Sequence, residues 1–229
     1  NYMDDDCDGE VDNGFCDENG KYFTDNACGN CYTDCQAIFN LPNAYGQCDN
    51  SGPVPVCMMM CDPGYYDLDQ IPQNGCEFQL QEDAIYVSTD GNNTGGCGTS
   101  PWNSCQTIYT GISEAVLHGK KQVLVANGLF NETIEIHPGI DLLGGYDPVT
   151  WARNPENTST IISGTTIMGS HLAAVIANNI TAPTIFSGFI IQGAVNNNPS
   201  GNFYAIYVSS SDANLRITDN SVYGGNAGD

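Results

Sequence analysis

The distribution of cysteine constrains the fold of this chain more than any other feature of its sequence. Of the eleven cysteines, nine lie in the first 80 residues, two follow soon after, and none comes later. So dense a cluster, in a segment with few aliphatic residues to build a core, is typical of a disulfide framework formed in an oxidising compartment. We therefore predict an extracellular or cell-surface protein with the disulfide cysteines Cys7, Cys16, Cys28, Cys31, Cys35, Cys48, Cys57, Cys61, Cys76, Cys97 and Cys105.

The sequence leaves the connectivity of these cysteines open, although the short spacing between Cys97 and Cys105 allows a local disulfide. Because eleven is odd, at least one thiol is free, pairs with another chain, or pairs with a cysteine outside this stretch. We expect a processed or partial stretch of a longer protein, since no signal peptide is present at Asn1 and no closing element precedes Asp229.

The chain is strongly acidic, with 27 acidic and 5 basic side chains and a formal net charge of −22. Such a surface repels nucleic acid and anionic membranes, which excludes both as partners. No apolar run approaches the roughly 18 residues of a membrane-spanning helix, so we expect no membrane insertion. The acids are concentrated at the N-terminal end, because residues 1–80 hold 15 of them and a single base, Lys21.

Composition divides the chain into three zones. Residues 1–20 are a run of carboxylates interrupted by glycine, residues 21–80 are rich in cysteine, and the remainder is β-branched and apolar, broken by Gly, Asn, Ser and Thr. We predict an acidic calcium-binding loop at 1–20, a disulfide-stapled module at 21–80, and a strand-rich domain at 81–229 that is incomplete at its C-terminal end.

The acidic run of the first zone is the clearest binding motif. Oxygen ligands recur there at alternating positions and Gly9 occupies the sixth place, as a loop around Ca²⁺ requires. The twelfth place, which usually provides a bidentate acid, is Phe15, so the last ligand must come from Asp17, from Glu18 or from elsewhere. The alternative is a solvated acidic tail, although unpaired carboxylates this close repel one another. The predicted Ca²⁺ ligands are Asp4, Asp6, Asp8, the carbonyl of Glu10, Asp12 and Asp17.

Other candidate metal ligands give weaker signals. Asp67, Asp69 and Glu77 are candidates for a second calcium site. A Cys-x-x-Cys pair at 28–31 and a Cys-Met-Met-Met-Cys run at 57–61 offer sulfur ligands for zinc and for Cu(I). The many other cysteines favour disulfides over thiolates at both places. A metal-capture protein therefore ranks as an alternative interpretation, behind the disulfide framework.

The last zone contains one helical pattern among many short strand patterns. Apolar residues recur at helical spacing over Gln106–Leu117, which predicts a helix with Ser104 as its cap and Gly119 just past its end. Strands so short and numerous indicate a sandwich, a barrel or a solenoid. The predicted strands are 85–87, 123–125, 133–136, 140–143, 160–162, 174–176, 189–191, 205–208 and 215–217.

A loose internal repeat favours the solenoid among these folds. An offset of 31 residues superposes Val175 on Ile206 and Phe186 on Ile217, and it also superposes 184 on 215 and 191 on 222. In a solenoid each set of strands stacks in register on the next and supplies part of a continuous core.

Residues 85–147 resemble the opening of bacterial pectin-lyase-like parallel β-helices of extracellular type. The resemblance rests on a first strand from Ile85, a glycine-rich loop with Pro101-Trp102, the helical segment, a strand at 123–128, and the segment 142–147 with its paired glycines. It implies that the first strand, the loop and the helix cap a solenoid. The predicted fold class is therefore all-β, a right-handed parallel β-helix with a short N-terminal capping helix, preceded by a small disulfide-rich, loop-dominated module.

The first two zones also resemble parts of secreted proteins. The acidic loop is similar in spacing to the aspartate loops of thrombospondin type 3 repeats and to a metal-binding motif of large bacterial surface proteins. Residues 28–78 look like a small cysteine-rich module found beside such motifs in secreted bacterial proteins. This resemblance implies calcium as the bound ion.

The sequence offers little for catalysis. A lyase on such a fold needs an Arg or Lys base beside carboxylates, and the simplest interpretation of Arg216 is a surface ion pair with Asp212 or Asp219. The three histidines show neither triad nor metal spacing, and no nucleophile elbow, phosphate loop or dinucleotide motif is present. We therefore expect no enzymatic activity in this stretch, and we assign no catalytic residue.

These features predict an extracellular calcium-binding structural or surface protein that self-assembles into filaments or a surface layer. The expected partners are further copies of the chain, as a homo-oligomer or polymer, and a surface polysaccharide. One alternative is a carbohydrate-active protein, either polysaccharide lyase-like or sugar-binding through exposed Trp151, Tyr204, Tyr207 or Tyr223. The other is the metal-capture protein.

Overall fold

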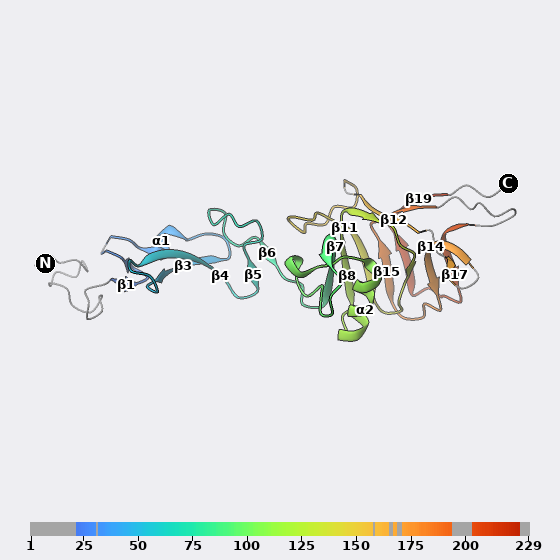
Figure 1. The fold of residues 1–229 in the computed structure, drawn as a ribbon, viewed down its shortest axis with the longest axis horizontal. Helices are drawn as coiled ribbons and strands as arrows, with labels where there is room; N and C mark the ends of the chain where they lie inside the picture. The colour runs from blue at the N-terminus through green and yellow to red at the C-terminus, as the bar shows by residue number, and fades with distance from the viewer. Residues whose placement is uncertain are drawn as a thin grey trace, which may run out of the picture. The chain divides into compact units, whose positions relative to one another are not determined.

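The computed structural model describes residues 22–30, 32–157, 159–164, 167, 168, 171–193 and 203–224. The chain divides into two compact units, Asn1–Leu80 and Gln81–Asp229 (Figure 1). Within the described ranges, no helix is long and apolar enough to cross a membrane.

The first unit is built from short antiparallel strand pairs and one turn of helix. The helix α1 (Cys35–Ile38) begins after Asp34, whose carboxylate accepts hydrogen bonds from the N–H groups of Gln36 and Ala37. Strand pairs of this size are marginally stable in water without further support. The pairs are β1 (Phe23–Thr24) with β2 (Ala27–Cys28), β3 (Ala44–Asp49) with β4 (Val56–Cys61), and β5 (Tyr65–Tyr66) with β6 (Phe78–Gln79).

Three disulfides supply that support. Cys28–Cys48 joins β2 to β3, Cys35–Cys57 joins α1 to β4, and Cys61–Cys76 joins the end of β4 to the segment before β6. Half of the buried apolar side chains in the described part of this unit are themselves cysteines, because the set consists of Tyr22, Ala27, Cys28, Cys35, Cys76 and Phe78. The disulfides therefore provide much of the stability that an apolar core provides in a larger domain.

The second unit is rich in strands. A fourth disulfide, Cys97–Cys105, closes the loop between its first strand and its helix. The prediction of a disulfide framework is thus confirmed for eight cysteines, while Cys7, Cys16 and Cys31 lie outside the described residues. The strands are β7 (Ala84–Asn92), β8 (Gln122–Ala126), β9 (Gly128–Phe130), β10 (Ile134–Glu135), β11 (Asp141–Tyr146), β12 (Thr160–Ser163), β13 (Ile167–Met168), β14 (His171–Asn178), β15 (Thr184–Ser187), β16 (Ile190–Gln192), β17 (Tyr204–Ser209), β18 (Leu215–Thr218) and β19 (Ser221–Tyr223), and the helices are η1 (Pro101–Asn103) and α2 (Ile108–His118).

These strands form three sheets that are mainly parallel. One sheet has the order β18-β15-β11-β8-β7 and a second the order β19-β16-β12-β9, while in the third β14 pairs in parallel with β10 and β17 and antiparallel with β13. Apolar side chains from all three sheets make one buried cluster, which includes Val175, Phe186 and Ile191. This cluster is the main core of the second unit.

The last described strands pair at the offset predicted from the sequence. Val175 lies opposite Ile206 and Phe186 opposite Ile217, and along the same strands Ser209 Oγ donates to Asn178 Oδ1, 31 residues away. The predicted 31-residue offset is therefore confirmed as a strand register for this part of the chain.

The predicted fold class requires correction. The structure is strand-rich with several parallel sheets, but no closed solenoid is found among the described residues, and the first unit pairs its strands antiparallel. The reason lies in the spacing along the chain. Leu142 pairs with Val123 on one side and with Phe186 on the other, so the second step along the chain is more than twice as long as the first. One repeat length therefore does not describe the unit.

The helix α2 begins later than the pattern predicted. Its N-terminal cap is Thr107, whose hydroxyl accepts the N–H of Thr110, and its C-terminal cap is Gly119 in the left-handed conformation, with φ of 66°. Glu132, from the loop after β9, contributes further capping because its two carboxylate oxygens accept the N–H groups of Ile108 and Tyr109 at 2.8 and 3.0 Å. The carboxylate thus satisfies donors at the end of α2 that have no partner within the helix.

The Glu132 cap predicts a specific dependence of stability on pH. Burial raises the pKa of the Glu132 carboxyl above its usual 4.5, although the N–H groups of Tyr109 and Ile108 act in the opposite direction. Because the pKa of this carboxyl is higher in the folded chain than in the unfolded one, the folded chain holds the proton more tightly. The stability that this proton binding adds is complete at low pH and is lost as the pH rises through the folded-state pKa. We expect the melting temperature of the wild type, relative to that of Glu132→Gln, to fall as the pH rises above 4.5, the usual pKa of the carboxyl. Glu135→Gln, at an exposed position on β10, is the control, and a rise of the difference with pH would contradict the assignment.

Candidate functional site

An acidic group lies on the turn that connects β5 and β6. One carboxylate oxygen from each of Asp67, Asp69 and Glu77 lies within 4.8 Å of the other two. The pairing of β5 with β6 and the Cys61–Cys76 disulfide bring the two ends of this segment together. The proximity of the three acids, suggested by the sequence, is thus confirmed.

Backbone donors organise the three carboxylates. Glu77 Oε1 accepts the N–H groups of Leu68 and Asp69 at 2.7 and 3.1 Å. The N–H of Ile71 donates to Asp67 Oδ1 at 3.1 Å and to Asp69 Oδ1 at 2.9 Å. In the part of the chain that the structure describes, Glu77 Oε2 accepts no hydrogen bond. An oxygen therefore remains for a ligand.

The pKa of Asp67 reflects this crowding. It is raised from its ordinary value, first by partial burial and then by repulsion from the Glu77 carboxylate, while the N–H of Ile71 opposes the rise. A bound cation would reverse the effect of the neighbouring charges, because it favours the ionised form of all three acids. Three carboxylates are hard oxygen ligands and suit Ca²⁺, which takes six to eight oxygens and completes its shell with carbonyls or water.

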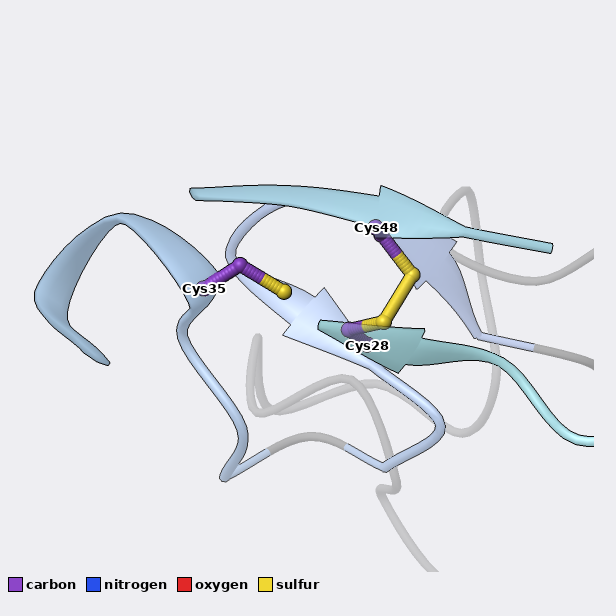
Figure 2. A group of neighbouring side chains, drawn as sticks. All are labelled: Cys28, Cys35 and Cys48. Carbon is purple, nitrogen blue, oxygen red and sulfur yellow. A yellow bond between two sulfur atoms is a disulfide. The ribbon is translucent and has the colours of Figure 1, made fainter. Parts of the chain in front are cut away.

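The sulfur atoms of the first unit form a second group that is close enough to consider for a metal. Figure 2 shows Cys28 and Cys48 joined by their disulfide, with the side chain of Cys35 beside them. The three sulfur atoms lie within 4.8 Å of one another, but Cys35 is bonded in turn to Cys57. A cysteine binds zinc or Cu(I) as a thiolate and not as part of a disulfide. All eight described cysteines are oxidised, so this group offers no thiolate.

The predicted N-terminal calcium loop stays a prediction. Its ligands Asp4, Asp6, Asp8, Glu10, Asp12 and Asp17 all lie outside the described residues.

A groove on the second unit was missed at the level of sequence. It has a volume of about 380 Å³ and lies between one side of α2 and the segment 135–138, which begins at the last residue of β10. We call it the α2 groove. The spacing of Tyr109, Ile112 and Val116, three and four residues apart, is a signal for it, because it places an apolar side on α2 in addition to the buried one.

No protein-family model, curated protein or solved structure matches this chain. The acidic group and the groove are therefore assessed by their own chemistry.

The aromatic residues considered for sugar binding are not gathered into one site. Trp151 is only 6% exposed and packs edge-on against Tyr86, with ring centroids 4.9 Å apart. Tyr204 and Tyr207 contact each other on β17, with centroids 5.3 Å apart, and Tyr223 lies on β19. The expectation of an exposed Trp151 was wrong, because the turn after β11 directs the indole into an aromatic cluster with Tyr86 and Tyr146.

The basic and imidazole side chains likewise show no catalytic arrangement in the described residues. The expected ion pair of Arg216 with Asp212 or Asp219 is not formed, and Asp219 instead accepts the hydroxyl of Ser187 at 3.1 Å. His118 contacts Glu114 one turn earlier on α2, at 3.1 Å. The side chain of His171 lies outside the described part of the chain.

Arg153 has a structural role that its sequence position did not indicate. Its Nε donates to the carbonyl of Gly144 on β11 at 3.0 Å, and its Nη2 donates to Ser187 Oγ on β15 at 2.9 Å. The guanidinium also lies 5.9 Å from the ring centroid of Tyr146. Through Ser187 the contacts continue to Asp219, just after β18, so one side chain ties together neighbouring strands of the five-stranded sheet.

Proposed function

We propose that this chain is an extracellular structural or surface protein that binds Ca²⁺. The disulfide framework of the first unit carries the proposal, because cross-links replace an apolar core there and are typical of proteins in an oxidising compartment. The second unit adds parallel sheets stacked around one apolar core. Rigid scaffolding is the role that both units support.

Calcium is the part of the proposal that rests on the acids. Asp67, Asp69 and Glu77 offer three carboxylates in one place, and the run at 4–17 supplies the sequence pattern of a second site. Binding would offset part of the formal charge of −22 and remove repulsion among the carboxylates. Both effects favour a compact, rigid first unit.

We expect calorimetric titration of the chain with CaCl₂ to detect sites of roughly 10⁻⁴ to 10⁻³ M affinity, the range of extracellular modules. The double variant Asp69→Asn with Glu77→Gln is expected to lose one bound ion, because two of three carboxylates become neutral. Asp8→Asn with Asp12→Asn is expected to lose the other.

Asp49→Asn is the matched control, since Asp49 is an acid of the same unit that accepts hydrogen bonds from the N–H and the side chain of Ser51. Unchanged stoichiometry in Asp69→Asn with Glu77→Gln would overturn the site on the β5–β6 turn. No heat of binding in the wild type would overturn the calcium proposal as a whole.

Association of copies is the remaining part of the proposed function. Ile217 and Val222 lie opposite the fully buried Phe186 and Ile191 in the strand register, yet both are exposed. A second copy that covers these side chains would remove apolar surface from water. Sedimentation velocity with and without millimolar CaCl₂ tests this part, and a monomer at all concentrations in both buffers would contradict it.

A further inference from the structure

The α2 groove is explained neither by the packing of the second unit nor by its proposed scaffolding role. Ile108 and Ala115 are buried where α2 packs against β7 and β8. On the side that lines the groove, Tyr109 is 67% exposed and Val116 is 48% exposed. A contiguous apolar side rimmed by polar groups marks a site of interaction on a soluble protein.

Most polar groups of the groove accept hydrogen bonds rather than donate them. The Glu135 carboxylate makes no hydrogen bond to the described residues. Nδ1 of His137 lies 3.0 Å from the carbonyl oxygen of Pro138, which can only accept, so Nδ1 is the donor of this contact. Ser113 donates its hydroxyl to the carbonyl of Tyr109, which leaves its oxygen to accept. The main donor on the rim is the side-chain amide of Asn178.

The acidic charge of the second unit favours a cationic ligand among those that donate hydrogen bonds. Within the second unit, Gln81–Asp229, acidic side chains outnumber basic ones by 12 to 4, so the field of this unit attracts cations and repels anions. A neutral apolar ligand would take the Glu135 carboxylate out of water without giving it a partner, which is unfavourable. The complementary ligand is therefore apolar along its length and cationic at its end.

We propose that the α2 groove binds a lysine side chain of a basic partner peptide. Its methylene stem would pack on Ile112, Val116 and Pro138. Its ammonium group carries only hydrogen-bond donors, which match the Glu135 carboxylate and the other acceptors of the groove. The ring of Tyr109 adds a face on which a cation is favoured. This inference does not depend on calcium binding or on self-association. The lysine site can therefore fail while the proposed function holds, and the proposed function can fail while the lysine site holds.

Fluorescence polarisation of a short labelled peptide of glycine, serine and lysine tests the proposal on the full chain. The titration is run at about 0.15 M salt, where exposed charges more than about 8 Å apart are largely screened. We expect the same peptide with Nε-acetyllysine to bind about tenfold more weakly, because acetylation removes the charge. Tyr109→Ala and Glu135→Gln are each expected to weaken binding of the lysine peptide about fivefold or more.

Matched controls separate the groove from general attraction to an acidic protein. Tyr223→Ala and Glu156→Gln change an exposed tyrosine and an exposed glutamate elsewhere on the second unit and are expected to leave binding unchanged. Tyr109→Phe keeps the ring and is expected to keep the affinity. Equal binding of the acetylated peptide, or equal losses in Glu135→Gln and Glu156→Gln, would overturn the proposal. Binding of free cadaverine without binding of the peptide would overturn the assignment to a peptide partner.

Discussion

Replacement of Cys35 and Cys57 by alanine is expected to destabilise the first unit by about 3 kcal/mol, the usual contribution of a disulfide that closes a loop of this length. The separation between the two cysteines is 22 residues, and the bond connects α1 to β4. Since half of the unit's described apolar core is cysteine, little remains to hold the strand pairs together. Limited proteolysis with mass mapping is expected to show new cleavage sites throughout residues 22–80.

Cys97→Ala with Cys105→Ala provides the location control for this experiment. That disulfide lies in the second unit and closes a separation of only 8 residues, so new cleavage is expected in the loop between β7 and α2 while the first unit stays protected. Complete reduction of the wild type should produce both patterns. Protection of residues 22–80 in the Cys35→Ala, Cys57→Ala variant would show that the strand pairs hold without this cross-link.

The sequence predicted the helix and the strands whose apolar residues recur at regular spacing. The helix and the nine strands of the last zone all have counterparts in α2, β7, β8, β10, β11, β12, β14, β16, β17 and β18. The start of the helix was misplaced, because the carbonyl of Ser104 accepts the N–H of Asn92 and Cys105 bridges to β7. These contacts keep the chain extended as far as Thr107. They come from residues far away in the sequence, so a local cap signal could not reveal them.

Elements that depend on their neighbours were missed. β9 and β19 begin at Gly128 and Ser221 and have three residues each, and β15 ends in Ser187. Such segments have too few alternating apolar residues to identify, and they become strands because an adjacent parallel strand offers hydrogen-bond partners. The fold class was wrong for a related reason, since it depends on which distant strands pair and not on the strands themselves.

The candidate site could be predicted in its composition and not in its geometry. Asp67, Asp69 and Glu77 were grouped because acids are typical of calcium ligands. Their approach to within 4.8 Å depends on a strand pair and a disulfide whose connectivity the sequence left open. Trp151 shows the opposite case, since a residue type typical of sugar binding is placed by a positive φ of 53° into a buried aromatic cluster.

Phe186→Ala is expected to destabilise the second unit by about 3–5 kcal/mol, the cost of removing a large buried ring. Phe186 is fully buried and stacks on Phe189 with ring centroids 4.8 Å apart. It lies between Leu142 of β11 and Ile217 of β18, so the cavity would form on β15, the strand next to the β18 edge of the five-stranded sheet. Urea unfolding followed by tryptophan fluorescence reports this unit alone, because Trp102 and Trp151 are the two tryptophans of the chain.

Ile217→Ala is the matched control, because Ile217 occupies the next position in the same row of the register but is 38% exposed. Its loss removes less buried surface and leaves no enclosed cavity, so a cost of about 1 kcal/mol or less is expected in the monomer. A similar cost for both substitutions would mean that the apolar core continues past β18 in solution. At concentrations where copies associate through this end, the cost of Ile217→Ala should rise while that of Phe186→Ala stays constant.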